Sequence, residues 1–186
     1  MLNSYQSLRK AIFLDRDGTI NENTGYVHRI EDFKWLPGAI EALKILHQAN
    51  YLLIVVSNQS GIARHYYTEE DLHSLEEAIN QILQKEACPI RAFYHCPHLP
   101  LLTGPCKCRK PEPGMILQAM VEHHLNHNLS WMIGDHLSDV EAGFKAQVKT
   151  IKLGEGLSLE DQKAKELGAL IFKDLYTAAK FIVSQA

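Results

Sequence analysis

Short apolar runs alternate along the chain with polar segments in which apolar residues recur every three or four positions. Runs of the first kind predict buried strands, and segments of the second kind predict helices. Four runs are clear strand candidates and two are weaker; they span residues 11–15, 51–58, 90–95 and 130–135, followed by 148–153 and 170–172. Because the runs are continuous rather than alternating, we expect strands covered on both faces, as in the parallel sheet of an α/β fold.

The segments between these strands predict helices with recognisable starts. Pro37 suits the first turn of a helix that ends before Asn50, because that position needs no backbone N–H. Thr68 can cap a second helix with its side-chain oxygen. A third helix begins at Pro113, and two more flank the last strand after Leu157. This alternation of strands and helices favours a sheet with helices on both faces.

Length and charge limit the classes of function. The 186 residues contain no linker, repeat or low-complexity segment, so we expect a single domain over residues 1–186. The formal net charge is −3, and charges of both signs are interspersed. Proteins that bind nucleic acid or membrane surfaces carry basic stretches that this chain lacks. We expect a monomer with a small-molecule partner, and neither nucleic acid nor membrane as a partner.

Targeting signals are missing from the sequence as given. No segment approaches the roughly 18 consecutive apolar residues of a membrane span, and residues 1–10 do not combine a basic start with an apolar run. We therefore expect a cytoplasmic protein. In that reducing compartment structural disulfides are disfavoured, so clustered cysteines favour a metal site.

Acidic residues follow two of the predicted strands. Asp15 and Asp17 come at the end of the first strand, and Asp135 ends the fourth. The carboxyl ends of parallel strands converge on one crevice, and residues two apart in an extended chain face the same way. Asp15 and Asp17 should therefore share a site while Arg16 points elsewhere. Clustered carboxylates repel one another unless a cation lies between them, and an all-oxygen ligand set favours Mg²⁺.

Phosphoryl chemistry gives each of these polar residues a role. Asp15 can attack phosphorus to form an aspartyl phosphate, and Asp17 can protonate the leaving oxygen and then activate water. Ser57 and Asn58 end the second strand and could donate hydrogen bonds to the phosphoryl oxygens. Lys110 could neutralise the charge that develops in the transition state. The sequence thus predicts a magnesium-dependent phosphoryl-transfer site.

Four motifs occur in an order that resembles the haloacid dehalogenase superfamily. They are "DRDGT" at residues 15–19, "SNQSGI" at 57–62, "CRKP" at 108–111 and "GDHLSD" at 134–139. The resemblance implies a Rossmann-like, haloacid dehalogenase-like fold and a phosphatase that acts through an aspartyl phosphate. It also implies that Asp15, the carbonyl of Asp17 and Asp135 hold Mg²⁺. No insertion is long enough for a large cap domain, so short loops should shape the pocket.

A cysteine-rich loop spans residues 96–108, directly before two cations. Its C-x-H-x₇-C-x-C pattern contains two pairs of residues at i, i+2 spacing, which suits a closed tetrahedral Zn²⁺ site. The four candidate ligands are Cys96, His98, Cys106 and Cys108. Free buried thiols are the alternative, and a disulfide is less favoured still. A zinc ion on Cys108 would also fix the backbone that carries Arg109 and Lys110.

This loop, together with "GYVH" and "GIAR…TE", resembles the D-glycero-D-manno-heptose 1,7-bisphosphate 7-phosphatase branch of the superfamily. That resemblance implies removal of the C7 phosphate from a phosphorylated sugar, a step toward ADP-heptose for lipopolysaccharide. Histidinol-phosphate phosphatases are near relatives and remain an alternative, because "CPHLP" resembles them and position 136 is His where Lys is common. The substrate-binding residues that the comparison implies are Asn23, Thr24, Gly25, Tyr26, Asn58, Arg109 and His136.

Three points stay open at this stage. A zinc-stabilised phosphate-binding module without catalysis and a phospho-accepting receiver domain are rival classes, although neither needs all of these motifs together. Asp139 could position Lys110 or the metal's water, or could simply favour the helix dipole. Cys88 lies outside the ligand spacing and is interpreted as a buried thiol.

Overall fold

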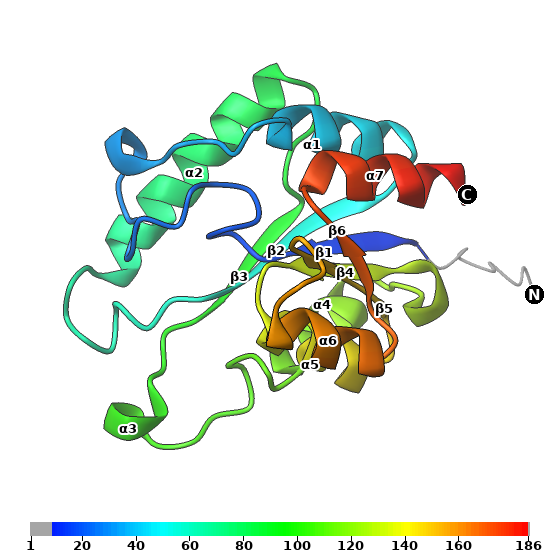
Figure 1. Cartoon of the computed structure of the whole chain (residues 1–186). Helices are drawn as coiled ribbons and strands as arrows, with labels where there is room; N and C mark the ends of the chain where they lie inside the picture. The colour runs from blue at the N-terminus through cyan, green and yellow to red at the C-terminus, as the bar shows by residue number, and fades with distance from the viewer. Residues whose placement is uncertain (1–8, 186) are drawn as a thin grey trace, which may run out of the picture.

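Six parallel strands form one sheet in the order β3-β2-β1-β4-β5-β6 (Figure 1). The structure is a computed structural model that describes residues 9–185, so residues 1–8, where we expected no leader, lie outside the described part. The strands are β1 Ala11–Leu14, β2 Leu52–Asn58, β3 Ala92–Cys96, β4 Trp131–Gly134, β5 Lys149–Leu153 and β6 Leu170–Phe172. All six strand predictions are therefore confirmed, with ends that differ by up to two residues.

Helices cover both faces of this sheet. In Figure 1, α1, α2 and α7 lie above the sheet, and α4, α5 and α6 lie below it. The helices are α1 Ala39–Gln48, α2 Glu69–Lys85, α3 Pro100–Thr103, α4 Gly114–Glu122, α5 Leu137–Lys145, α6 Leu159–Glu166 and α7 Leu175–Ser184, with 3₁₀ turns η1 Ile30–Asp32 and η2 His127–Leu129. The predicted α/β fold class is confirmed.

The structure confirms the predicted start of α2 but not that of α1. The side chain of Thr68 accepts a hydrogen bond from the Asp71 backbone N–H at 3.2 Å, and the Asp71 carboxylate accepts one from the Thr68 N–H at 2.8 Å, so the predicted cap of α2 is confirmed. By contrast, α1 begins only at Ala39, two residues after Pro37. Gly38 intervenes with φ +76°, a left-handed conformation that cannot belong to the helix.

The strand β1 shows why its sequence is apolar throughout. All four of its side chains are fully buried. Ile12 and Leu14 lie in the core that includes residues of α1, α2 and α7, whereas Ala11 and Phe13 lie in the core with α4 and α5. A strand buried on both faces has no polar side to alternate with. The central position of β1 also places its carboxyl end between those of β2 and β4, at the point where the strand order reverses and ligands bind in open α/β sheets.

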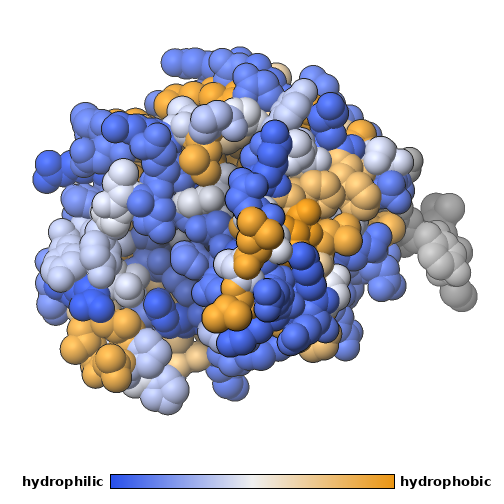
Figure 2. Space-filling view, in the orientation of Figure 1, coloured by the Kyte–Doolittle hydropathy of each residue, from blue (hydrophilic) through white to orange (hydrophobic). Residues whose placement is uncertain are grey.

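Two of the apolar patches in the view of Figure 2 lie at segments with exposed leucines. One lies at α3, the tip of the loop after β3, where Leu101 and Leu102 are exposed, and the other lies at the start of α6, where Leu157 and Leu159 are exposed. The surface between them is mostly hydrophilic. Within residues 9–185, no helix combines the length and the apolar character that crossing a membrane would require.

A buried ion pair away from the strand-end crevice gives a pH-dependent prediction for stability. The Nζ atom of Lys152 lies 2.8 Å from Oδ1 of Asp161, and both side chains are buried. The hydrogen bond from Lys152 and those from Ser158 hold the pKa of Asp161 well below its ordinary value. This carboxylate therefore stabilises the fold at pH values above about 4, the unfolded pKa, and the contribution is lost as the pH falls toward the lowered folded value.

We expect Asp161→Asn to lower the free energy of unfolding by about 2 kcal/mol at pH 7, the scale of a hydrogen bond to a charged group. Denaturant unfolding of wild type and variant between pH 7 and pH 3 measures the difference. It should shrink in the acidic samples, because below about pH 4 Asp161 binds a proton in the unfolded chain but not in the folded protein. A difference that stays constant over this pH range would show that the charge contributes nothing.

Candidate active site

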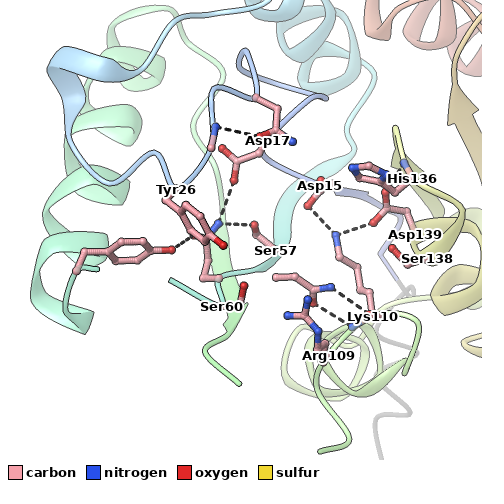
Figure 3. Close-up of a pocket in the computed structure, with 15 residues that line it drawn as sticks. Asp15, Asp17, Tyr26, Ser57, Ser60, Arg109, Lys110, His136, Ser138 and Asp139 are labelled. Carbon is pink, nitrogen blue, oxygen red and sulfur yellow. Dashed lines mark hydrogen bonds and ion pairs between the residues drawn. The ribbon is translucent and has the colours of Figure 1, made fainter. Parts of the chain in front are cut away.

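A buried ammonium group lies at the centre of the strand-end crevice. The Nζ atom of Lys110 lies 2.6 Å from Oδ1 of Asp15, 2.6 Å from Oδ1 of Asp139 and 2.8 Å from the carbonyl oxygen of Val56 (Figure 3). Asp15 directly follows β1, Asp139 lies in the first turn of α5, and Lys110 comes from the loop after the cysteine cluster. The fold thus brings three distant segments together around one cation.

Burial and charge shift the pKa values of this group in identifiable ways. Burial raises the pKa of Asp15 to about 7, against the opposing effect of the Lys110 charge. Burial alone would lower the pKa of Lys110, but the Asp139 and Asp15 carboxylates outweigh it and hold that pKa above its ordinary value. Lys110 therefore stays positively charged. A second cation beside Asp15 would favour its carboxylate form, which a nucleophile requires.

The carboxylates around Lys110 fit a divalent cation. One oxygen each of Asp15, Asp135 and Asp139 lies within 4.8 Å of the others. The two oxygens of Asp139 are already engaged, by Lys110 and by the backbone N–H of His136 at 3.0 Å. Oδ1 of Asp135, by contrast, is buried without a hydrogen-bond partner among residues 9–185. This oxygen of Asp135, next to Asp15, is therefore suited to bind Mg²⁺, as predicted.

Gly18 provides the room for Asp135. A Cβ atom at position 18 would lie 2.2 Å from Oδ2 of Asp135, and the glycine has φ +84°. Both the space and the backbone conformation therefore demand glycine. The part that we assigned to the Asp17 carbonyl in holding magnesium stays a prediction.

The carboxylate of Asp17 lies in the same cavity as Asp15 but has its own set of donors. Arg16 Nη2 lies 2.8 Å from Oδ2, Asn21 Nδ2 lies 3.0 Å from Oδ1, and Gln59 Nε2 lies 3.1 Å from Oδ2. Our expectation that Arg16 points away from the site is wrong, because its buried guanidinium binds Asp17. The chain turns at Gly18, so the alternation of an extended strand no longer holds at positions 16 and 17.

The strand-end residues of β2 divide into two functions. Ser57 lines the cavity, and its Oγ atom accepts a hydrogen bond from Gln59 Nε2 at 2.7 Å. Asn58 also lines the cavity, but its amide pairs with the backbone of Lys110: Nδ2 donates to the Lys110 carbonyl, and Oδ1 accepts from the Lys110 N–H, each at 3.0 Å. The direct phosphoryl contact that we expected of Asn58 stays a prediction. Its side chain fixes the segment that carries the lysine.

Loops after β1, β3 and β4 complete a cavity of about 450 Å³. Among the predicted substrate-binding residues, those that line it are Asn23, Gly25, Tyr26, Asn58, Arg109 and His136. Thr24 does not line it; its side of the loop faces a separate surface depression with Val27 and Lys34. Tyr26 lies over the cavity, opposite Arg109 (Figure 3).

Several residues of the cavity were missed by the sequence analysis or left open by it. Gln59, Ser60, Tyr67 and Ser138 also line it, together with Asp139. Gln59, Ser60 and Ser138 lie within four residues of a predicted strand-end residue, and that proximity was the available signal. Nothing in the sequence pattern pointed to Tyr67. Asp139, whose role the sequence left open, binds Lys110 and also accepts a hydrogen bond from the backbone N–H of His136, the N-cap residue of α5.

The four residues of the predicted zinc site form a cluster after β3. Cys96 ends that strand, and its Sγ lies 3.6 Å from both His98 Nδ1 and Cys106 Sγ. Cys108 Sγ lies 3.3 Å from His98 Nδ1 and 3.5 Å from Cys106 Sγ. Ligand atoms of a tetrahedral zinc site lie roughly 3.3–3.8 Å apart, given metal–ligand distances of about 2.0–2.3 Å. These four separations and the donor set fit Zn²⁺, whereas the separation of Cys108 Sγ from Cys96 Sγ, 2.9 Å, is shorter than this range.

The alternatives to zinc fit this cluster less well. The shortest separation between sulfurs is 2.9 Å, from Cys108 to Cys96, and all four cysteines of the chain are free thiols. A disulfide would need a bond of about 2.03–2.05 Å. Cys88 is fully buried elsewhere, as predicted. The cluster therefore lacks a covalent link of its own, and a metal ion is the link that its chemistry favours.

The main-chain carbonyl groups of two cluster residues accept hydrogen bonds that connect the cysteine cluster to the cavity. Arg109 follows Cys108 directly and its Nη1 donates to the carbonyl oxygen of His98 at 3.1 Å. On the other side, the carbonyl oxygen of Cys96 accepts from the Gln59 N–H at 2.8 Å. The positions of Arg109 and of Gln59 thus depend on the geometry of the cysteine cluster.

Comparison with known proteins extends this picture. The sequence matches the family described as "Polynucleotide kinase 3 phosphatase" over residues 10–147. It is 42% identical to the D-glycero-beta-D-manno-heptose-1,7-bisphosphate 7-phosphatase of Pasteurella multocida (strain Pm70), over 84% of this chain and 89% of that one. It is 45% identical to the D-glycero-alpha-D-manno-heptose-1,7-bisphosphate 7-phosphatase of Campylobacter jejuni subsp. jejuni serotype O:2, over 77% of this chain and 81% of that one.

A solved structure agrees with these relatives. The crystal structure of the D,D-heptose 1,7-bisphosphate phosphatase from B. bronchiseptica, complexed with magnesium and phosphate, superposes with a TM-score of 0.83 at 26% identity, and the match covers 96% of this chain and 100% of that one. The resemblance to the haloacid dehalogenase superfamily and its heptose branch is therefore confirmed. On these matches, the chain belongs to the polynucleotide kinase 3 phosphatase family and to the D-glycero-D-manno-heptose 1,7-bisphosphate 7-phosphatases.

Proposed function

We propose that the chain is a magnesium-dependent phosphatase that removes the C7 phosphate of D-glycero-D-manno-heptose 1,7-bisphosphate. The observation that carries this proposal is the Lys110 ammonium between Asp15 and Asp139, beside the unpartnered oxygen of Asp135. This arrangement supplies a nucleophile, a fixed cation and a place for Mg²⁺ at one strand-end crevice. The identity of the sugar is inferred from the names of the relatives.

In the first step, an oxygen of Asp15 attacks the phosphorus of the C7 phosphate. The bond from phosphorus to the sugar oxygen breaks, and Asp17 gives its proton to that leaving oxygen. Ser57 donates its hydroxyl hydrogen to a phosphoryl oxygen, and Lys110 neutralises the negative charge that develops. Mg²⁺, held by Asp15 and Asp135, would supply further positive charge next to the phosphoryl group.

In the second step, Asp17 takes a proton from a water molecule as that water attacks the aspartyl phosphate. The bond between Asp15 and phosphorus breaks, inorganic phosphate leaves, and Asp15 returns to its carboxylate form. Arg16, Asn21 and Gln59 donate to Asp17 and support the carboxylate that the second step needs. Lys110 stays paired with Asp139, so its charge is in place in both steps.

The phosphate that stays on the substrate needs a cation of its own. Lys110 is assigned to the reacting phosphate. Arg109, the preceding residue, is a second cation that lines the cavity. One of its nitrogens is anchored on the carbonyl oxygen of His98, which leaves other donors of the guanidinium free to face the cavity. A planar, partly anchored guanidinium suits bidentate binding of a phosphate.

We expect Arg109→Ala to lower kcat/KM for the bisphosphate by roughly 30- to 150-fold, the equivalent of about 2–3 kcal/mol for a charge-assisted hydrogen bond. The heptose 7-monophosphate, which lacks the second phosphate, should lose far less. Lys107→Ala is the matched control, because Lys107 is an exposed cation of the same loop that does not line the cavity. Equal losses for the two substrates would remove Arg109 from this role.

Phosphorus NMR of the reaction tests the proposed function. Incubation of the protein and Mg²⁺ with heptose 1,7-bisphosphate should release one equivalent of inorganic phosphate and leave a heptose 1-phosphate, and omission of Mg²⁺ should prevent the release. Loss of the C1 phosphate, or no release at all, would overturn the proposal. A monomeric state, a cytoplasmic location and the lack of a nucleic-acid partner stay predictions.

A further inference from the structure

The amide of Gln59 lies between two groups of the proposed reaction. Its Nε2 atom donates one hydrogen to Oδ2 of Asp17 at 3.1 Å and the other to Oγ of Ser57 at 2.7 Å. Both N–H groups of the amide are therefore used, and Gln59 itself is only 3% exposed. Figure 3 shows a dashed line at each of the two acceptors, Asp17 and Ser57. The Gln59 side chain thus positions both Asp17, the proposed general acid and base, and Ser57, the proposed donor to the phosphoryl group.

The oxygen end of the same amide is held by Tyr67. The Tyr67 hydroxyl donates to Oε1 of Gln59 at 2.5 Å and is buried. Burial raises the pKa of Tyr67 to about 12, so the hydroxyl keeps its hydrogen at neutral pH. The ring is fixed as well: it stacks on His28 with centroids 4.9 Å apart, and a Cβ atom at Gly61 would lie 2.1 Å from it.

We propose that Tyr67 and Gln59 act as a positioning pair. In this pair, the Tyr67 hydroxyl fixes the orientation of the Gln59 amide, so that its nitrogen faces Asp17 and Ser57. An amide can bind in two orientations that differ by exchange of its nitrogen and oxygen. The Tyr67 hydroxyl satisfies the oxygen and leaves the nitrogen for Asp17 and Ser57. Because Ser57 Oγ accepts from Gln59, its own hydrogen is free to point at a phosphoryl oxygen.

The direction also matters for Asp17. In the reversed orientation, Oε1 of Gln59 would face Asp17 and offer an acceptor for the proton that must pass to the leaving oxygen. The amide oxygen would also repel the Asp17 carboxylate that the second step uses, because neither group could donate. With Oε1 occupied by Tyr67, neither situation arises. Gln59 touches the reacting groups, whereas the hydroxyl of Tyr67 donates a hydrogen bond to Gln59 and to no other residue within 9–185.

The neighbouring residue Tyr66 provides a matched control. Its ring contacts Tyr26 edge to face, with centroids 4.8 Å apart, and more than half of the side chain is exposed. Its hydroxyl makes no hydrogen bond to any other residue within the part of the chain that the structure describes. Tyr66→Phe and Tyr67→Phe therefore remove the same atom from adjacent positions, but only the second removal should disturb the amide.

A double-mutant cycle tests the positioning pair, which rests on the proposed phosphatase function. Tyr67→Phe should lower kcat roughly 5- to 10-fold, about the value of one hydrogen bond, while Tyr66→Phe leaves kcat unchanged. In a Gln59→Leu background, Tyr67→Phe should change kcat less than about 2-fold, because Tyr67 no longer has an amide to orient. Gln59→Met replaces Gln59→Leu if the latter does not fold, as judged by thermal melting.

The outcomes separate this inference from the function on which it rests. If Tyr67→Phe retains full kcat, or if its loss is the same with and without Gln59, the positioning pair is wrong. If wild type hydrolyses p-nitrophenyl phosphate but not heptose bisphosphate, the sugar assignment fails, and the cycle is measured on p-nitrophenyl phosphate instead. A wild type that hydrolyses neither compound overturns both proposals.

Discussion

Asp15→Asn should reduce turnover by about 10⁴-fold or more while the protein stays folded. The amide nitrogen and oxygen of asparagine cannot form the aspartyl phosphate, and loss of a nucleophile costs on the order of 10⁴- to 10⁶-fold in enzymes with covalent intermediates. The buried Lys110 keeps Asp139 and the Val56 carbonyl as partners in this variant, so we expect little change in melting temperature. Steady-state phosphate release and thermal melting measure the two effects.

A second buried lysine–aspartate pair supplies the control for this experiment. Asp161→Asn breaks the contact with Lys152, which lies outside the cavity, so it should lower stability and leave kcat unchanged below the melting temperature. Asp15→Asn should thus lose turnover and keep its stability, whereas Asp161→Asn should lose stability and keep its turnover. An Asp15→Asn protein with turnover near that of wild type would mean that another group attacks phosphorus.

Loss of zinc should be the other large effect. We expect about one tightly bound zinc ion per chain, and Cys108→Ser should lose that ion, lower the free energy of unfolding by about 3 kcal/mol or more, and reduce kcat/KM. Structural zinc sites have apparent binding free energies of about 10–16 kcal/mol, much of which appears as folding free energy. Activity should fall too, because Arg109 and Lys110 directly follow Cys108.

Elemental analysis, denaturant unfolding and kinetics measure these three effects on the same preparations. Cys88→Ala is the control, since Cys88 is a buried thiol outside the cluster and its loss should leave the zinc content unchanged. A metal-free preparation with the melting temperature and kcat/KM of wild type would contradict the structural role of the cluster.

Local patterns were enough to predict the strands and the residues at their ends. The run before Asp15 is apolar because β1 is buried on both faces, and a polar residue can follow only where the strand leaves the core. The same reasoning placed Ser57 and Asp135 at the crevice. Cys96 and its partners were predicted because metal ligands repeat at short spacing. These features all depend on neighbours within a few residues.

Contacts between distant segments could not be predicted in this way. Lys110 meets Asp139 across 29 positions, and Gln59 meets Asp17 across 42. Such pairs depend on the strand order and on how each loop turns. The turn at Gly18 also folded Arg16 back onto Asp17, against the rule for extended chains.

The place of Tyr67 depends in the same way on a loop rather than on a motif. Its ring reaches Gln59 only because Gly61 leaves room for it. The sequence alone gave no reason to prefer Tyr67 to the adjacent Tyr66. The tertiary fold distinguishes them, since one hydroxyl is buried against the site and the other residue is exposed.

The identity of the substrate is decided by kcat/KM values for heptose 1,7-bisphosphate and histidinol phosphate, measured on one preparation. Histidinol phosphate has a single phosphate and cannot use Arg109 as proposed. We expect the bisphosphate to be preferred by about 30-fold or more, the scale of the Arg109 contact. A preference for histidinol phosphate would overturn the heptose assignment and show that the chain is a histidinol-phosphate phosphatase.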